Sequence, residues 1–169
     1  VVRFIMNQNK EYDYIHFELG RKDSDKVGLG IIPAMLKSFR DWRRLLKHYP
    51  NAIIHFNFPF TKTCIIRESM YLLFVKKQKL IVHIHGGDYL FSDNKPFYIE
   101  YLLKRLFKRK IPFIVLSEKE KEHIENTYHC GQVISLPNCV DLTDAHGYQK
   151  NYHSDKIVLG YIGRISTTK

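Results

Sequence analysis

Short apolar runs alternate along the chain with longer stretches in which apolar residues recur every three or four positions. A short run rich in β-branched residues predicts a buried strand, and a three- to four-residue period predicts an amphipathic helix. The runs predict strands at 12–17, 52–56, 80–84, 112–116 and 132–136. The periodic stretches predict helices at 32–49, 61–78 and 98–110, a helix that begins after Ser117, and the tail of a helix at 1–9.

The order of these elements predicts the fold class. Strands that alternate with helices form βαβ units, in which the strands lie parallel. We therefore expect an α/β fold, namely a Rossmann-like three-layer α/β/α arrangement with a mostly parallel sheet. Residues 142–156 are polar and lack apolar periodicity, which is typical of a linker, and the apolar run at 157–162 begins another unit. The expected organisation is a domain at 1–141, a linker at 142–156, and the first strand and loop of a second, truncated domain at 157–169.

Length and composition fit one domain with its own hydrophobic core, because the 169 residues are 44% hydrophobic. The 27 Lys and Arg residues outnumber the 17 Asp and Glu residues, which gives a formal net charge of +10. A basic protein favours anionic partners such as nucleic acid, phosphorylated ligands or an acidic membrane surface. Charge alone does not choose among these partners.

One side of the helix predicted at 98–110 is strongly basic. Its members are Lys104, Arg105, Lys108 and Arg109, with Lys76, Lys77 and Lys79 nearby in the sequence. Such a side is either a solvated helix face or a contact for anionic lipid headgroups. The chain has neither a helix-turn-helix pattern nor a basic stripe interleaved with aromatic residues. An anionic membrane surface is therefore the favoured partner, and nucleic acid is not expected.

The three cysteines, Cys64, Cys130 and Cys139, are odd in number and lack metal-binding spacing. Reduced thiols, typical of cytoplasmic proteins, are therefore expected rather than a disulfide framework. No apolar run reaches the roughly 18 residues needed to span a bilayer, and no signal-peptide pattern opens the chain. We expect a cytoplasmic protein that associates peripherally with the inner face of the membrane.

His85 is the first candidate for chemistry, because it follows the strand predicted at 80–84 and precedes Gly86, Gly87 and Asp88. Open α/β sheets bind ligands beyond the carboxyl ends of their strands. Glycines let a ligand approach the backbone, and a histidine at this position can donate a hydrogen bond or transfer a proton. The loop at 85–88 is therefore the candidate site.

Three further histidines lie within predicted strands. His83 shares a strand face with His85, and a buried, hydrogen-bonded role is expected for it. His16 and His55 each stand between an isoleucine and a phenylalanine, so core hydrogen bonding is expected for both.

Other motifs point to different chemistry. A histidine and two glycines after a strand resemble the oxyanion loop of lipase-type hydrolases, but the chain has no G-x-S-x-G nucleophile motif, which disfavours a hydrolase. Asp23 and Asp25 form the D-x-D pattern by which some sugar transferases hold a divalent cation. Gly28 and Gly30 begin a dinucleotide-binding pattern, but Pro33 stands in place of its third glycine, so that site is not supported.

Three segments together resemble a known family. They are V-H-I-H-G-G-D at 82–88, L-P-N-C-V-D at 136–141, and L-G-Y-I-G-R-I-S-T-T-K at 159–169. Their order and spacing are similar to those of the retaining glycosyltransferases of family 4, which have the two-domain GT-B architecture. In that family an I-P-N-G-V-D segment ends the first Rossmann-like domain, and a strand leading to G-R-L-x-x-x-K begins the second. Cys139 replaces the usual glycine of the first of these segments.

The resemblance implies roles for the matching residues. His85 would lie in the interdomain cleft beside the transferred sugar and act in catalysis, with the loop of Gly86, Gly87 and Asp88 on the acceptor side and Asn138 near the cleft. Arg164 and Lys169 would bind the donor diphosphate, since a forked guanidinium and a point-like ammonium suit phosphate oxygens. Transfer in this family generally needs no divalent metal, so no cofactor or metal is expected, and Asp23 and Asp25 become weaker candidates.

The expected function is transfer of a sugar from a nucleotide-sugar donor to a glycan or lipid-linked acceptor, in cell-surface polysaccharide synthesis. The family's first strand and its acidic donor-binding pair would lie outside the chain, so residues 1–169 alone are expected to be inactive. The alternatives are a nucleotide-sugar epimerase of the same architecture and a non-catalytic α/β module that binds anions or membranes.

Overall fold

A computed structural model gives the fold of the chain and describes residues 6, 9–19, 31–138 and 147. The chain divides into two compact units, Val1–Asn138 and Cys139–Lys169. Nearly all of the described residues belong to the first unit. The predicted linker, the apolar run at 157–162 and most of the helix predicted at 1–9 lie outside them.

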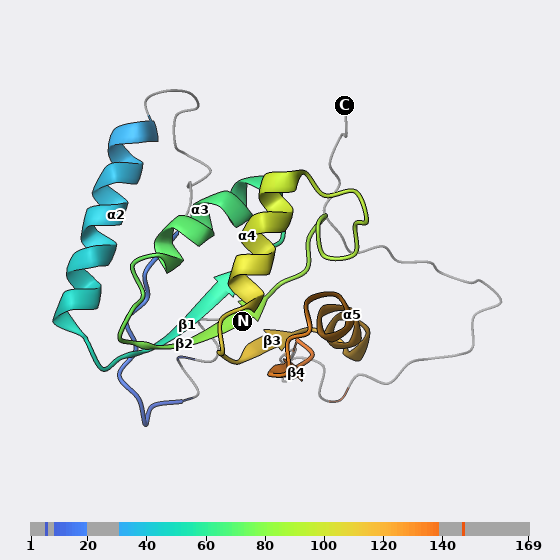
Figure 1. The fold of residues 1–169 in the computed structure, drawn as a ribbon. Helices are drawn as coiled ribbons and strands as arrows, with labels where there is room; N and C mark the ends of the chain where they lie inside the picture. Colours follow the sequence, from blue (N-terminus) through green and yellow to red (C-terminus); the bar gives the residue numbers. More distant parts are fainter. Residues whose placement is uncertain (1–5, 7–8, 20–30, 139–146, 148–169) are drawn as a thin grey trace. The chain divides into compact units, whose positions relative to one another are not determined.

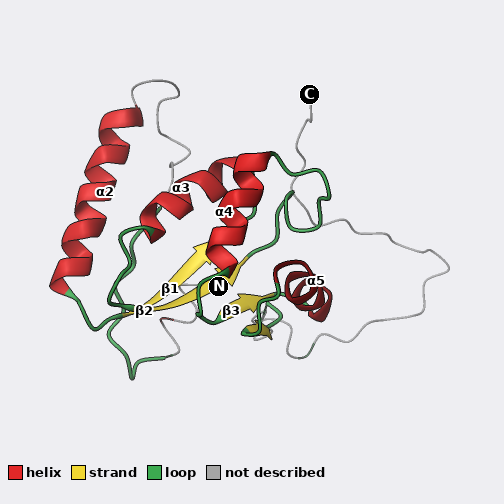
Figure 2. Cartoon of the chain, in the orientation of Figure 1, coloured by secondary structure: helices red, strands yellow, loops and turns green. Residues whose placement is uncertain are grey.

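The described part of the first unit contains four helices and four strands (Figures 1 and 2). In chain order they are α2 (Ile31–His48), β1 (Ile53–Phe58), α3 (Lys62–Leu72), β2 (Lys79–Ile84), α4 (Phe97–Phe107), β3 (Phe113–Val115), α5 (Glu118–Tyr128) and β4 (Val133–Ser135). The strands lie in the order β1-β2-β3-β4, and every neighbouring pair is parallel. The expected fold class is confirmed: the chain has an α/β fold with an all-parallel sheet, consistent with a fragment of a Rossmann-like three-layer α/β/α fold.

The strand register builds one buried face of the sheet. Phe56 pairs with Val82, Val82 with Phe113, and Phe113 with Val133, so an apolar row crosses all four strands. All four of these side chains are buried. Successive side chains of a strand point to opposite faces. The next row along the strands therefore lies on the other face, and it consists of Asn57, His83, Ile114 and Ile134.

Aromatic side chains join the helices to the apolar face. The ring centroid of Phe107, at the end of α4, lies 4.9 Å from that of Phe113 and 4.3 Å from that of Tyr128, at the end of α5. Trp42 of α2 lies 6.4 Å from Phe56 of β1. Figure 1 shows α3 and α4 over the same side of the sheet. The row that contains His83 therefore faces away from these helix contacts.

Most predicted elements are confirmed, with shifted ends. Helices α2 and α4 and strands β2 to β4 lie where the pattern placed them, within a few residues. The strand predicted at 52–56 ends too early, because Asn57 and Phe58 continue the β1 ladder opposite His83 and Ile84. The helix predicted to extend to residue 78 ends at Leu72. Beyond it, the amides of Phe74 and Val75 donate to carbonyls three residues earlier, as in the tighter turns of a 3₁₀-helix.

The strand predicted at 12–17 is wrong. These residues form no regular element, and Tyr12 and Ile15 are more than half exposed. Only Phe17 packs inward, with its ring 5.1 Å from Trp42. A strand needs a neighbour that satisfies its backbone groups, and aromatic and β-branched composition does not supply one. His16 is consequently exposed rather than bonded within a core strand.

Helix α5 begins after Ser117, as predicted, and half of a capping box forms at its start. The Ser117 hydroxyl accepts a hydrogen bond from the Glu120 amide at 3.3 Å, as an N-cap should. The Glu120 carboxylate accepts from the amide of Leu116 at 2.7 Å, one residue before the cap. This bond turns Glu120 back toward the carboxyl end of β3.

Candidate active site

The loop after β2 is held against the end of β1 by backbone hydrogen bonds. The amide of His85 donates to the carbonyl of Phe58 at 3.4 Å, and the amide of Phe60 donates to the carbonyl of Gly86 at 2.8 Å. The amide of Tyr89 then donates to the carbonyl of Phe60 at 3.0 Å. The parallel pairing of β1 and β2 thus continues past both strands and fixes His85 at the carboxyl edge of the sheet.

Two glycines are needed to make this loop. Gly86 has φ +64° and Gly87 has φ +129°, a region that other residues rarely adopt. A Cβ on Gly87 would come within 2.6 Å of the backbone of Phe60, whereas a Cβ on Gly86 would meet only the Glu120 carboxylate oxygen Oε1, at 4.0 Å. Gly87 is therefore required by close backbone packing, and Gly86 lies beside the carboxylate of Glu120.

Three imidazole rings gather on the face opposite the helices. His55 Nε2 lies 3.2 Å from His83 Nδ1, and the rings of His83 and His85 are 4.1 Å apart. His85 Nε2 lies 2.9 Å from Asn57 Oδ1. Because an amide oxygen only accepts, His85 Nε2 carries the proton and Nδ1 keeps the lone pair. The register that pairs Asn57 with His83 brings these four side chains together.

The histidines of this cluster resist protonation. Burial, together with the neighbouring His85 and His55, lowers the pKa of His83 to about 4. Burial also lowers the pKa of His55 and of His85, although the carboxylate of Glu120 partly opposes the shift at His85. His83 is only 5% exposed, and its Nε2 has no hydrogen-bond partner among the described residues. At neutral pH the cluster therefore offers uncharged imidazoles.

The geometry of the cluster fits hydrogen bonding better than metal binding. The rings of His55 and His83 are almost coplanar, at 9°, with centroids 5.3 Å apart and nitrogens 3.2 Å apart. The two nitrogens thus point nearly at each other, which suits one shared proton rather than two lone pairs that converge on a cation. Within the described residues, no group of three His, Cys, Asp or Glu side chains is arranged to hold a metal. Asp23 and Asp25 lie outside these residues.

The structure adds two residues that the sequence pattern did not single out. Asn57 ends up beside His85 because β1 ends two residues later than predicted, at Phe58. Glu120 reaches the loop from the first turn of α5 and interacts electrostatically with His85. A polar residue near the carboxyl end of a strand was the available signal for Asn57. No local signal in the sequence marked Glu120 as a site residue.

The other predicted site residues are not joined to His85. Asp88 and Asn138 are exposed, in the loop after β2 and beyond the end of β4. Among the described residues, no hydrogen bond links either of them to His85. Arg164 and Lys169 lie outside the described residues.

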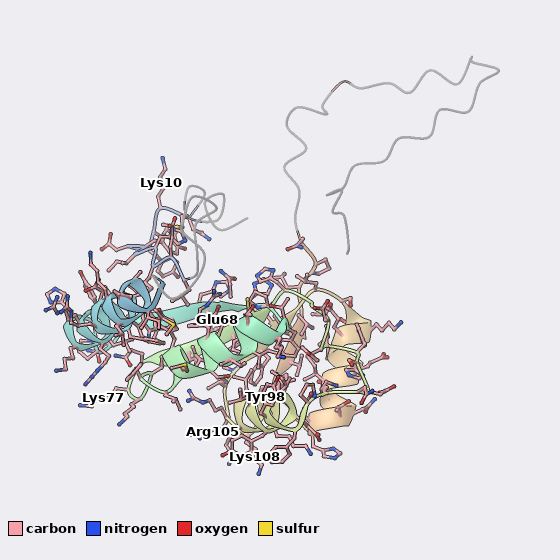
Figure 3. The ribbon with its side chains drawn as sticks, turned by 90° about the horizontal axis from the view of Figure 1, so that it is seen from above. Lys10, Glu68, Lys77, Tyr98, Arg105 and Lys108 are labelled. Atoms are coloured by element: carbon pink, nitrogen blue, oxygen red, sulfur yellow. The ribbon has the colours of Figure 1, made fainter. Side chains whose placement is uncertain are left out.

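The basic side of α4 is smaller than predicted. Lys104, Arg105 and Lys108 are exposed, and Figure 3 shows Arg105 and Lys108 extending outward from the ribbon, as Lys77 does. Lys104 pairs with Glu100 at 2.6 Å. Arg109 is half-buried and donates a hydrogen bond to the carbonyl of Leu72 at 2.9 Å, so it joins the turn after α4 to the end of α3.

Cys64 and Cys130 are free thiols, and none of the described helices is long and apolar enough to cross a membrane. No protein-family model, curated protein or solved structure matches the chain significantly.

Proposed function

We propose that the chain is the acceptor-side part of a retaining glycosyltransferase with two Rossmann-like domains. The enzyme would transfer a sugar from a nucleotide-sugar to a glycan or lipid-linked acceptor in cell-surface polysaccharide synthesis. The observation that carries this proposal is the uncharged imidazole of His85, held at the carboxyl edge of the sheet beside a two-glycine loop. This edge is where α/β folds bind their substrates.

The surroundings of His85 suit contact with a sugar hydroxyl. Asn57 orients the ring through Nε2, and the neutral ring can exchange that bond for one to a substrate oxygen. Gly86 carries no side chain that would block the approach of a sugar ring, and the space beside its Cα is open as far as the Glu120 carboxylate. In this proposal Asp88 and Asn138 line the acceptor side, and His85 is the catalytic residue.

The donor half of the proposal rests on sequence similarity. Arg164 and Lys169 would hold the diphosphate of the nucleotide-sugar, as the matching residues do in family 4 glycosyltransferases. The reaction would use no metal or cofactor.

The experiment is a transfer assay on the full-length protein with nucleotide-sugars labelled in the sugar, supplied with a membrane and glycan extract from the source cells. We expect label to become attached to an acceptor and His85→Ala to reduce the rate by about a hundredfold or more, since a polar group that acts in the transition state contributes about that much. His16→Ala is the matched control, because His16 is exposed and outside the cluster. Circular dichroism and urea unfolding would verify that both variants fold.

The outcomes separate the alternatives. Label converted into a soluble isomer, with none attached to acceptor, would indicate the epimerase. Equal activity of wild type and His85→Ala would exclude His85 from catalysis and remove the main support for the proposal.

A further inference from the structure

Helix α2 has an inner face that packs and an outer face that is both apolar and basic. Phe39 and Trp42 are buried, and the Trp42 indole donates a hydrogen bond to the carbonyl of Tyr71 in α3 at 3.1 Å. Leu36, by contrast, is 61% exposed, and Ile32 is 44% exposed. Apolar side chains on a helix that already has a packed face indicate a second contact surface.

A groove of about 590 Å³ separates α2 from the end of α3. Apolar side chains from both helices and from the turn after α3 line it, and they are Leu36, Phe39, Met70, Leu73 and Phe74. Phe39 and Phe74 touch at the base, with ring centroids 6.1 Å apart. Met70 and Leu73 are 41% and 48% exposed, so the sides of the groove stand open to solvent. Figure 1 shows the two helices beside each other.

All four charged residues that line the groove are positive: Arg40, Arg43, Arg44 and Lys47. Their spacing places them in one row along α2. Arg44 has only a weak, exposed ion pair with Asp41, at 3.7 Å. No described carboxylate pairs with Arg40, Arg43 or Lys47. The guanidinium of Arg43 lies over the ring of Phe74, 5.4 Å from its centroid, so positive charge reaches the apolar base.

We propose that this α2–α3 groove docks the protein onto a membrane that contains anionic phospholipid. Lipid phosphates would lie among the four cations, while Leu36, Met70 and Leu73 enter the boundary between headgroups and acyl chains. An amphipathic helix with basic and apolar residues on its outer face binds membranes in this way. Each cation near an anionic surface strengthens binding about fivefold.

The arrangement fits a lipid surface better than an acidic peptide. The exposed apolar residues extend beyond the groove along both helices, to Ile32 on α2 and to Ile66, which is 38% exposed, on α3. A peptide would contact only the residues that line the groove, whereas a membrane surface would also contact the projecting side chains of both helices. The inference is separate from the transferase proposal, because vesicle binding requires no sugar chemistry.

The test is co-sedimentation of the 169-residue chain with phosphatidylcholine vesicles that contain either no phosphatidylglycerol or about 30 mol% phosphatidylglycerol. We expect binding only to the anionic vesicles, and about 30-fold weaker binding for Arg40→Gln/Arg43→Gln, at roughly fivefold for each cation. The matched control is Arg105→Gln/Lys108→Gln, which removes the same charge from α4 and its C-cap and should weaken binding less than threefold. Leu36→Ser should weaken binding about tenfold. Ile134→Ser, at a similarly exposed strand position, should leave it unchanged.

Two results would overturn the inference once circular dichroism shows that the variants are folded. Equal loss in the α2 and α4 charge variants would mean that net charge, not the groove, attracts the vesicles. Binding to an amphipathic helical peptide with leucines on one face and glutamates on the other, without binding to the anionic vesicles, would assign the groove to a protein partner instead.

Discussion

Replacing Gly87 with alanine should destabilise the fold more than the same change at either of two other glycines. Gly87 has φ +129°, and a methyl group added at its Cα would lie 2.6 to 2.8 Å from three backbone atoms of Phe60. Backbone atoms cannot move aside as the end of a flexible side chain can. The loop itself must therefore shift away from β1.

The expected cost follows from two terms. Holding alanine in this region of φ costs about 1–3 kcal/mol. Shifting the loop weakens the hydrogen bonds from Phe60 to Gly86 and from Tyr89 to Phe60, now 2.8 and 3.0 Å long, each of which contributes about 1 kcal/mol. Gly87→Ala should therefore lower the free energy of unfolding by about 3–5 kcal/mol.

The other two glycines provide internal comparisons. Gly86→Ala should cost about 1–2 kcal/mol, because φ is +64° but the space around it is open. Gly131 has no left-handed φ and no atom within 4 Å of an added Cβ. Gly131→Ala should be neutral or stabilise by about 0.4–1 kcal/mol, since alanine restricts the unfolded chain.

Urea unfolding followed by circular dichroism measures all three variants. We expect the midpoint to fall in the order Gly131→Ala, Gly86→Ala, Gly87→Ala, with little change in the urea dependence of the unfolding free energy. A cost at Gly87 below about 1.5 kcal/mol, or no larger than at Gly86, would refute the argument that the loop backbone is packed tightly against Phe60.

Three further changes test the core and the buried charges. The pKa of His83 is about 4 in the folded protein and near 6.5 in the unfolded chain. The free energy of unfolding should therefore fall by about 2–3 kcal/mol as pH drops from 6.5 to 4. In urea titrations, His83→Gln should flatten this pH dependence. Burial raises the pKa of Glu68, so ionisation of this carboxyl destabilises the wild type as pH rises. The stability of Glu68→Gln relative to the wild type should therefore increase between about pH 4 and pH 8. The same stability difference between the two proteins at both pH values would contradict this. Phe107→Ala should cost about 3–5 kcal/mol in thermal or urea unfolding, whereas Phe97→Ala, at a position 83% exposed, should change stability by less than about 0.5 kcal/mol.

The sequence pattern correctly predicted four strands that alternate with helices, and the position of His85 just beyond a buried strand. These features depend on local periodicity and on the residues that directly follow a strand, so residues close together in the sequence are enough to predict them. Gly86 and Gly87 were likewise recognisable as a loop that needs unusual backbone angles. Local pattern failed at 12–17, because a strand also requires a neighbouring strand.

Tertiary structure alone decided how the candidate site is assembled. The β1–β2 register places Asn57 opposite His83, and this long-range pairing leads to the bond between Asn57 and His85. Packing of α5 brings Glu120 to Gly86. The α2–α3 groove is lined by side chains of α2, of α3 and of the turn after α3. Each of these features joins residues that are distant along the chain, so their contacts depend on the packing of whole elements rather than on local sequence.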